Sequence, residues 1–375
     1  MTPAHQTNRR LIYRFRVVTL VIVFLAFEAA LGWFTPANYL FRQTLNPAAI
    51  DRAAAGRYLE SPNFDPVLGW DANPISRNHE EGRNYLAQAY GDSHTRGAEV
   101  GDDETWQSQY FDITGQRILN FGVNGYGLDQ AVLKFEKYGA RHHTRYAILA
   151  LNYQEYRRNP SHYSLYCFGS TVFEHIFRYS FKPIFLPDGN DWDLRLPPCR
   201  DANCMIETLQ DSSGRLRAFL AMHDQCYQRN EKRPFYRFPY TINFLRGLAI
   251  ALRERSGSTE TDNYAFVNGA SFALSKYLVT RFTKRCEEIG VQPLILLIYG
   301  PEDLPEIARG ERLDARLLDF LRDRRIPFVD SGEFMTRKGG ADEDLSMPMG
   351  HFTKAGNRLI AEALAASPLL SKPER

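Results

Sequence analysis

A short, almost entirely apolar segment over residues 145–151 constrains the fold of this chain most strongly. A strand without polar alternation is buried on both faces, which is typical of a parallel sheet covered by helices. Further short strands and amphipathic helices alternate along the chain, and this alternation indicates βαβ units. The sequence therefore predicts an α/β fold. The other expected strands cover residues 85–90, 117–121, 292–299 and 326–330, and the expected helices cover 128–138, 270–289, 312–323 and 353–366.

The N-terminal region has the pattern of a membrane anchor. Four arginines, the last of them Arg16, precede an apolar run over residues 17–27, and Glu28 is the only charged residue between Arg16 and Arg42. About 20 apolar residues span a bilayer, so residues 16–34 suffice if Glu28 is tolerated. The basic N-terminus is then expected in the cytoplasm and the remainder of the chain outside it. A cleaved signal peptide and a buried core helix are the alternatives.

The overall composition argues against several functional classes. The chain has 375 residues, of which 44% are hydrophobic, and a formal net charge of +2. A charge this small gives no field for nucleic-acid binding. The sequence has no zinc-finger spacing, Walker loop or dinucleotide-binding glycine pattern, so we expect neither a metal nor a cofactor.

The spacing of motifs divides the chain into three parts. We expect an N-terminus with its anchor over residues 1–35, a proline-punctuated lead-in segment over 36–83, and a catalytic domain over 84–370. An insertion at about 160–267 interrupts this domain. It is rich in aromatic residues, which can stack on sugar rings or hold an acyl chain, although ordinary loop and helix packing is the simpler interpretation. It also contains Cys199 and Cys204, which we expect to form a disulfide because they are close in sequence and export of the domain permits one.

Residues with chemical function follow the expected strands. The turn Gly91-Asp92-Ser93 ends the strand over 85–90, and a serine at the carboxyl end of a parallel strand lies where α/β sheets bind ligands. Asp92 and Ser93 could instead only cap the next helix. A glycine-rich stretch over 122–127 follows the next strand, and His351 precedes the last helix. These are the residue types of a nucleophile, backbone N–H donors and a base.

These blocks resemble those of the SGNH/GDSL hydrolases. The first block is Gly91-Asp92-Ser93, the second is the pattern Asn120-x-Gly122-x-x-Gly125, and the last is the histidine at position 351 with a glycine five residues later. The resemblance implies a flavodoxin-like three-layer α/β/α sandwich. It is greatest to membrane-anchored bacterial members, whose lead-in segment is similar to residues 65–70.

The same resemblance implies the roles of the site residues. Ser93 would be the nucleophile and His351 the base. The N–H groups of Ser93 and Gly125, with Asn152, would bind the oxyanion. No cofactor or metal would be needed.

Two departures from the family pattern affect these assignments. The third block normally contains Gly-x-Asn-Asp, whereas here Asn152, or else Gln154, must supply the oxyanion donor. The usual carboxylate three residues before the histidine is replaced by Pro348. Asp344 or Asp342 could orient the imidazole, or a backbone carbonyl could do so in a Ser–His dyad. His94, beside the nucleophile, is expected to point away into packing or solvent.

The resulting functional prediction is an exported, inner-membrane-tethered serine esterase with its domain in the periplasm. Its substrate would be an acylated small molecule or a cell-envelope glycan, for example an O-acetyl sugar, by analogy. An O-acyltransferase acting on an exported polysaccharide uses the same residues. The missing carboxylate leaves a third possibility, a weak or inactive carbohydrate-binding or assembly protein.

Overall fold

The structure is a computed structural model. It describes residues 3–34, 64–70, 73–152, 158–159, 161–162, 181–189, 191–211, 213–225, 227, 241, 270–339, 345–348 and 350–370. Much of the predicted insertion and of the lead-in segment lies outside these residues.

A five-stranded parallel sheet forms the centre of the domain, with strand order β2-β1-β3-β6-β7. Its central strand β3 is buried along its whole length, as the apolar segment predicts. The predicted parallel sheet is therefore confirmed. The strands are β1 (Ala87–Tyr90), β2 (Ile118–Asn120), β3 (Tyr146–Leu151), β6 (Gln292–Leu297) and β7 (Phe328–Asp330).

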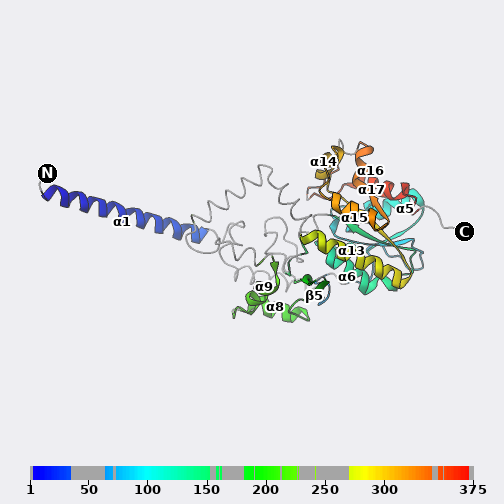
Figure 1. The fold of residues 1–375 in the computed structure, drawn as a ribbon, viewed down its shortest axis with the longest axis horizontal. Helices are drawn as coiled ribbons and strands as arrows, with labels where there is room; N and C mark the ends of the chain where they lie inside the picture. The colour runs from blue at the N-terminus through cyan, green and yellow to red at the C-terminus, as the bar shows by residue number, and fades with distance from the viewer. Residues whose placement is uncertain are drawn as a thin grey trace.

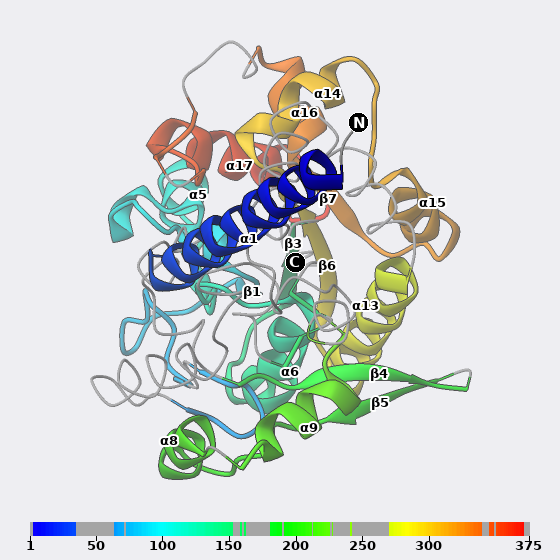
Figure 2. The same ribbon diagram turned by 90° about the vertical axis from the view of Figure 1, so that its left-hand side faces the viewer.

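Helices cover both faces of this sheet. Figures 1 and 2 show α6 and α13 on one side and α5, α16 and α17 on the other, with α14 beside α16. Figure 2 shows α15 on the same side as α6 and α13, and its buried leucines join the same hydrophobic cluster. Alternate strand residues enter two separate hydrophobic clusters, one beneath each helix layer. The chain is thus a three-layer α/β/α sandwich. The covering helices are α5 (Trp106–Thr114), α6 (Leu128–Tyr138), α13 (Ala270–Ile289), α14 (Leu304–Ala308), α15 (Ala315–Asp323), α16 (Ser331–Arg337) and α17 (Lys354–Ala366).

The predicted helices over 128–138 and 270–289 are confirmed at both ends, whereas several strands are shorter than predicted. The strand β6 stops at Leu297 instead of Tyr299. The Tyr299 hydroxyl donates to Asp314 Oδ2 at 2.6 Å, in a buried network that includes Arg312. The pairing of β6 ends at Leu297 because both partner strands end opposite it, at Leu151 of β3 and Asp330 of β7, and an apolar run does not reveal where its partners end.

The described part of the insertion forms a small lobe beside α6 and α13. Figure 2 shows the antiparallel hairpin of β4 (Ile184–Asp188) and β5 (Asp191–Arg195) next to α9 (Arg215–His223), with α8 (Ala202–Gln210) nearby. The lobe has its own small apolar cluster. It is joined to the sandwich by a completely buried ion pair, in which Lys182 Nζ donates to Asp129 Oδ2 at 2.5 Å. The interpretation as ordinary packing therefore accounts for this part of the insertion.

The predicted disulfide between Cys199 and Cys204 is wrong, because both thiols are free. Cys204 lies in the first turn of α8, where its backbone N–H donates to the capping Asp201. The Cys199 sulfur lies 3.3 Å from Thr208 Oγ1. The pKa of the Cys199 thiol is raised to about 12, mainly by burial and further by the neighbouring Cys204.

The N-terminal helix α1 (Pro3–Phe34) extends away from the sandwich in Figure 1. Apolar side chains between Val17 and Phe27 are exposed along it. Glu28, the charge that interrupts the apolar run, is buried against Thr241 and accepts its backbone N–H at 2.7 Å. Within the described parts of the chain, we find no helix whose length and apolar character would let it cross a membrane.

Candidate active site

The predicted nucleophile Ser93 lies where β1 ends and the sheet opens to a loop. It is the first residue of the single-turn helix α4 (Ser93–Arg96) and is buried except for 7% of its surface. Asp92 caps this turn, because its Oδ1 accepts the backbone N–H of His94 at 2.9 Å. The capping interpretation of Asp92 is therefore correct, and it leaves the Ser93 side chain available for other contacts.

The glycine-rich loop after β2 lies directly against the nucleophile turn. Val123 N donates to Gly91 O at 3.0 Å, and Asn120 Nδ2 donates to Arg96 O at 3.2 Å. A Cβ at Gly122 would lie 2.2 Å from Arg96 N, so only glycine permits this approach. The packing of these two loops follows from the second sequence block, which also contains Gly125.

Gly125 is buried and has a φ of +80°, which a residue with a side chain rarely adopts. Neither its N–H nor that of Ser93 donates a hydrogen bond to any described residue.

An arginine that sequence reasoning missed connects the two loops. Arg158 Nη1 donates to Asp92 Oδ2 at 3.0 Å and to Tyr126 O at 2.8 Å. Burial alone would raise the pKa of Asp92, but the interactions of its carboxylate with His94 and with the Arg158 guanidinium hold this pKa below its usual value. Arg158 thus fixes the residue before the nucleophile to the residue after Gly125.

The predicted base His351 lies beside the nucleophile turn. Its ring centroid is 5.1 Å from that of His94, the residue directly after Ser93. No hydrogen bond joins the side chains of Ser93 and His351 in the described structure, and such bonds commonly tighten only when substrate is present. A backbone hydrogen bond from Met347 N to His351 O, 2.7 Å long, and the cap of α17 at Thr353 hold the histidine loop.

His94 does not point away from the site as expected. It packs against His351, and its ring centroid lies 6.1 Å from that of Phe352. Burial, as the largest cause, lowers the pKa of His94 to about 4. His94 is therefore an uncharged packing partner of His351 near neutral pH.

The partner of His351 is a carboxylate that sequence reasoning missed. Glu99 Oε2 lies 2.6 Å from His351 Nδ1, although the residues are 252 positions apart. The two side chains are only 9% and 13% exposed. Glu99 is the first residue of the acidic stretch over 99–104, which follows Ser93 closely in sequence. This closeness is the only feature of the sequence that points to Glu99 as a site residue.

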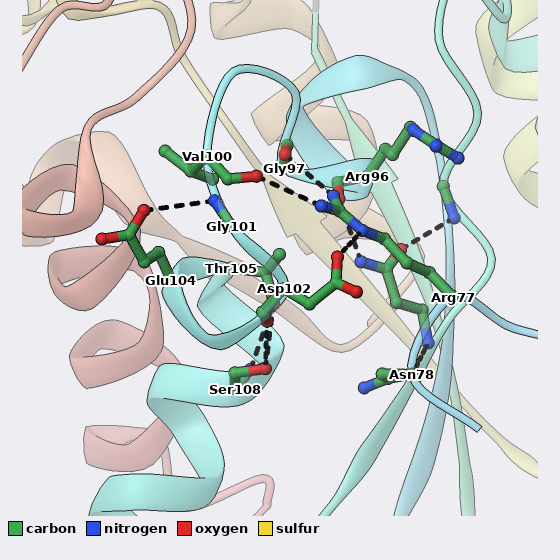
Figure 3. A network of polar contacts seen from close by, with 12 residues as sticks. Arg77, Asn78, Arg96, Gly97, Val100, Gly101, Asp102, Glu104, Thr105 and Ser108 are labelled. Carbon is green, nitrogen blue, oxygen red and sulfur yellow. Dashed lines mark hydrogen bonds and ion pairs between the residues drawn. The ribbon is translucent and has the colours of Figure 1, made fainter. Parts of the chain in front are cut away.

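Arg77, from the lead-in segment, holds the loop that carries Glu99 (Figure 3). Its guanidinium donates to three backbone carbonyls of this loop, those of Arg96, Gly97 and Val100, and also binds the Asp102 side chain. Asn78 in turn accepts the backbone N–H of Asn120 at 2.8 Å, along the edge of β2. The lead-in segment, for which the sequence suggested no chemistry, thus supports the site.

The remaining predicted site residues are only partly placed. Asn152 follows β3 and is 1% exposed, at the same edge of the sheet as Ser93. Asp344, Asp342 and Gln154 lie outside the described residues. In the described part of the chain, no group of three or more His, Cys, Asp or Glu side chains could hold a metal ion.

No protein-family model and no curated protein matches this chain. Similar solved structures include a lipolytic G-D-S-L family member from Veillonella parvula, with 12% identity, a TM-score of 0.36, and coverage of 76% of this chain and 97% of that one. Another is a protein from Desulfitobacterium hafniense assigned to the same family, with 9% identity, a TM-score of 0.35, and coverage of 75% and 98%. A third is a protein from Bacteroides fragilis assigned as an acylhydrolase, with 10% identity, a TM-score of 0.31, and coverage of 76% and 86%.

Proposed function

We propose that this protein is a serine hydrolase of ester bonds in which Ser93 and His351 form the catalytic unit. One observation carries the proposal: an imidazole held by a nearly buried carboxylate packs against His94, the residue directly after Ser93 in the turn that follows β1. A carboxylate only accepts hydrogen bonds, so Nδ1 of His351 carries the hydrogen and Nε2 keeps its lone pair. An imidazole with a free Nε2 is the form that removes a proton from a serine.

The reaction then proceeds by two acyl transfers. Ser93 Oγ attacks the ester carbonyl while His351 Nε2 takes the hydroxyl proton, and the carbonyl π electrons move to the oxygen. The tetrahedral intermediate collapses, His351 returns the proton to the leaving alkoxide, and an acyl-serine remains. Water then attacks the acyl-serine while His351 takes its proton, and His351 gives this proton to Ser93 Oγ as the bond to the acyl group breaks and the acid leaves.

The oxyanion is assigned to backbone donors on the two packed loops. The N–H groups of Ser93 and Gly125 meet no described acceptor, which supports their role as donors to the developing charge. The positive φ at Gly125 gives the loop its turn at this point. Asn152, at the same edge of the sheet, is proposed as a third donor.

The finer proposal concerns the substrate: we propose that the protein is an O-acetyl esterase that acts on cell-envelope glycans. Its alternative is an acyltransferase, which differs only in replacing water by a sugar hydroxyl. The test is incubation of the purified full-length protein with short acyl esters, with and without a sugar acceptor, followed by quantification of free acid and acylated sugar. Acid release independent of the acceptor indicates a hydrolase, and acylated sugar indicates a transferase.

Two results of this assay would reject both catalytic functions. One is the absence of both products, and the other is equal product formation by wild type and Ser93→Ala. Either result would favour the second alternative, a binding or assembly protein.

The export of the domain and its tether remain predictions from the sequence. The arginines before residue 17 and the apolar run after them favour a cytoplasmic N-terminus. A C-terminal alkaline phosphatase fusion should then be active in cells, and a fusion at the same point to a reporter active only in the cytoplasm should be silent. The reverse pattern would contradict the predicted location.

A further inference from the structure

We propose that Glu99 is the positioning carboxylate of His351, supplied from the loop after the nucleophile and held there by Arg77. This inference rests on the proposed function. The position three residues before the histidine is occupied by Pro348, whose side chain has no polar atom. An imidazole that acts as a base nevertheless needs its tautomer and orientation fixed.

The contact between Glu99 and His351 has the properties that this role requires. Its length of 2.6 Å is short for an N–H···O hydrogen bond, and an ionised acceptor shortens such bonds. Both side chains are nearly buried, so water competes little for either partner. The carboxylate approaches Nδ1, and this leaves Nε2 as the nitrogen available to Ser93. Glu99 therefore occupies the place at Nδ1 that an orienting carboxylate would take.

The backbone at Glu99 is held in an unfavourable conformation. Its φ is +69°, and among the described residues Arg325 is the only other non-glycine residue with a positive φ. Such conformations persist only where surrounding contacts enforce them, and they concentrate at functional sites. The backbone conformation thus agrees with a functional demand on this side chain.

Arg77 supplies contacts that enforce this loop conformation. It donates hydrogen bonds to Gly97 O (2.9 Å), which precedes Glu99 in the loop, and to Val100 O (3.1 Å), which follows it (Figure 3). The Arg77 side chain is 18% exposed. Ala98 N also donates to Ser93 O at 3.0 Å, which ties this loop to the nucleophile turn. The loop that carries Glu99 and the turn that carries Ser93 are therefore held together by hydrogen bonds.

The first test measures kcat and KM on a short acyl ester for Glu99→Gln, which keeps the shape of the side chain and removes its charge. We expect kcat to fall by about 10⁴, the loss typical of replacing the orienting carboxylate of a triad, with KM nearly unchanged. Asp103→Asn is the matched control, because Asp103 is an exposed carboxylate of the same loop. Its kcat should equal that of wild type. Arg77→Met should lower kcat in the same manner but less.

Further readouts separate positioning from loop stability. Added formate should restore part of the kcat of Glu99→Ala but not that of His351→Ala, because a small carboxylate can occupy the vacated position. The downfield proton resonance of a carboxylate-bound Nδ1–H should be present in wild type and Ser93→Ala and absent in Glu99→Ala.

The inference is overturned if Glu99→Gln keeps kcat within about twofold of wild type while Ser93→Ala is inactive. A loss in Asp344→Asn without a loss in Glu99→Gln would instead assign the role to Asp344. Full activity of Ser93→Ala would reject the proposed function itself.

Discussion

Alanine at Ser93 should reduce kcat on a short acyl ester by about 10⁶, and alanine at His351 should reduce it by a similar factor. The double variant should be little slower than either single variant, because members of one catalytic unit do not contribute independently. The residual rate would come from the N–H donors, which neither substitution removes. The expected non-additivity follows from a single proton passing between Ser93 and His351.

The controls for this prediction are residues of the same types outside the site. Ser213→Ala and His143→Ala replace exposed side chains and should leave kcat unchanged. All variants should keep the unfolding temperature of wild type within a few degrees. Losses that multiply in the double variant would show that Ser93 and His351 act separately, and would contradict the proposed unit.

The substitution Lys182→Met should destabilise the folded protein by about 3–5 kcal/mol, because it leaves the Asp129 carboxylate buried without its counter-charge. Both side chains are fully buried, and their atoms are 2.5 Å apart. Burial is the largest cause that raises the pKa of Asp129 and lowers that of Lys182. Each group therefore depends on the other to remain charged.

The double variant Lys182→Met/Asp129→Leu should recover much of this loss, because it removes both charges. Arg322→Met breaks an exposed pair with Asp319 and should cost less than about 1 kcal/mol. Urea unfolding of the four proteins measures these differences. A Lys182→Met midpoint equal to that of Arg322→Met would contradict the importance of the buried pair, and with it the role of this pair in joining the insertion lobe to α6.

The sheet and its helices could be predicted because their signals are local. The apolar run of β3 and the periodicity of α6 and α13 arise from residues next to one another in sequence. The cap at Asp92 is equally local, since its acceptor and donor are two residues apart. The close approach at Gly122 follows from the spacing of the second block.

The partners of the site residues could not be predicted, because they come from distant parts of the chain. Glu99 meets His351 across 252 positions, and Arg158 meets Asp92 across 66. Charge runs such as residues 99–104 are usually solvated. Nothing in the sequence therefore distinguishes Glu99, whose carboxylate is nearly buried, from the other acidic residues of this run. The Cys199–Cys204 disulfide failed for a related reason: proximity in sequence does not predict the helix that begins between the two cysteines.

The central claim, that His351 activates Ser93, is tested most directly by labelling with a fluorophosphonate, which reacts with activated serines. The account predicts that wild type incorporates one label on the peptide containing Ser93, that Ser93→Ala incorporates none, and that His351→Ala and Glu99→Gln react far more slowly. Absence of label on wild type, or equal labelling of wild type and Ser93→Ala, would contradict it.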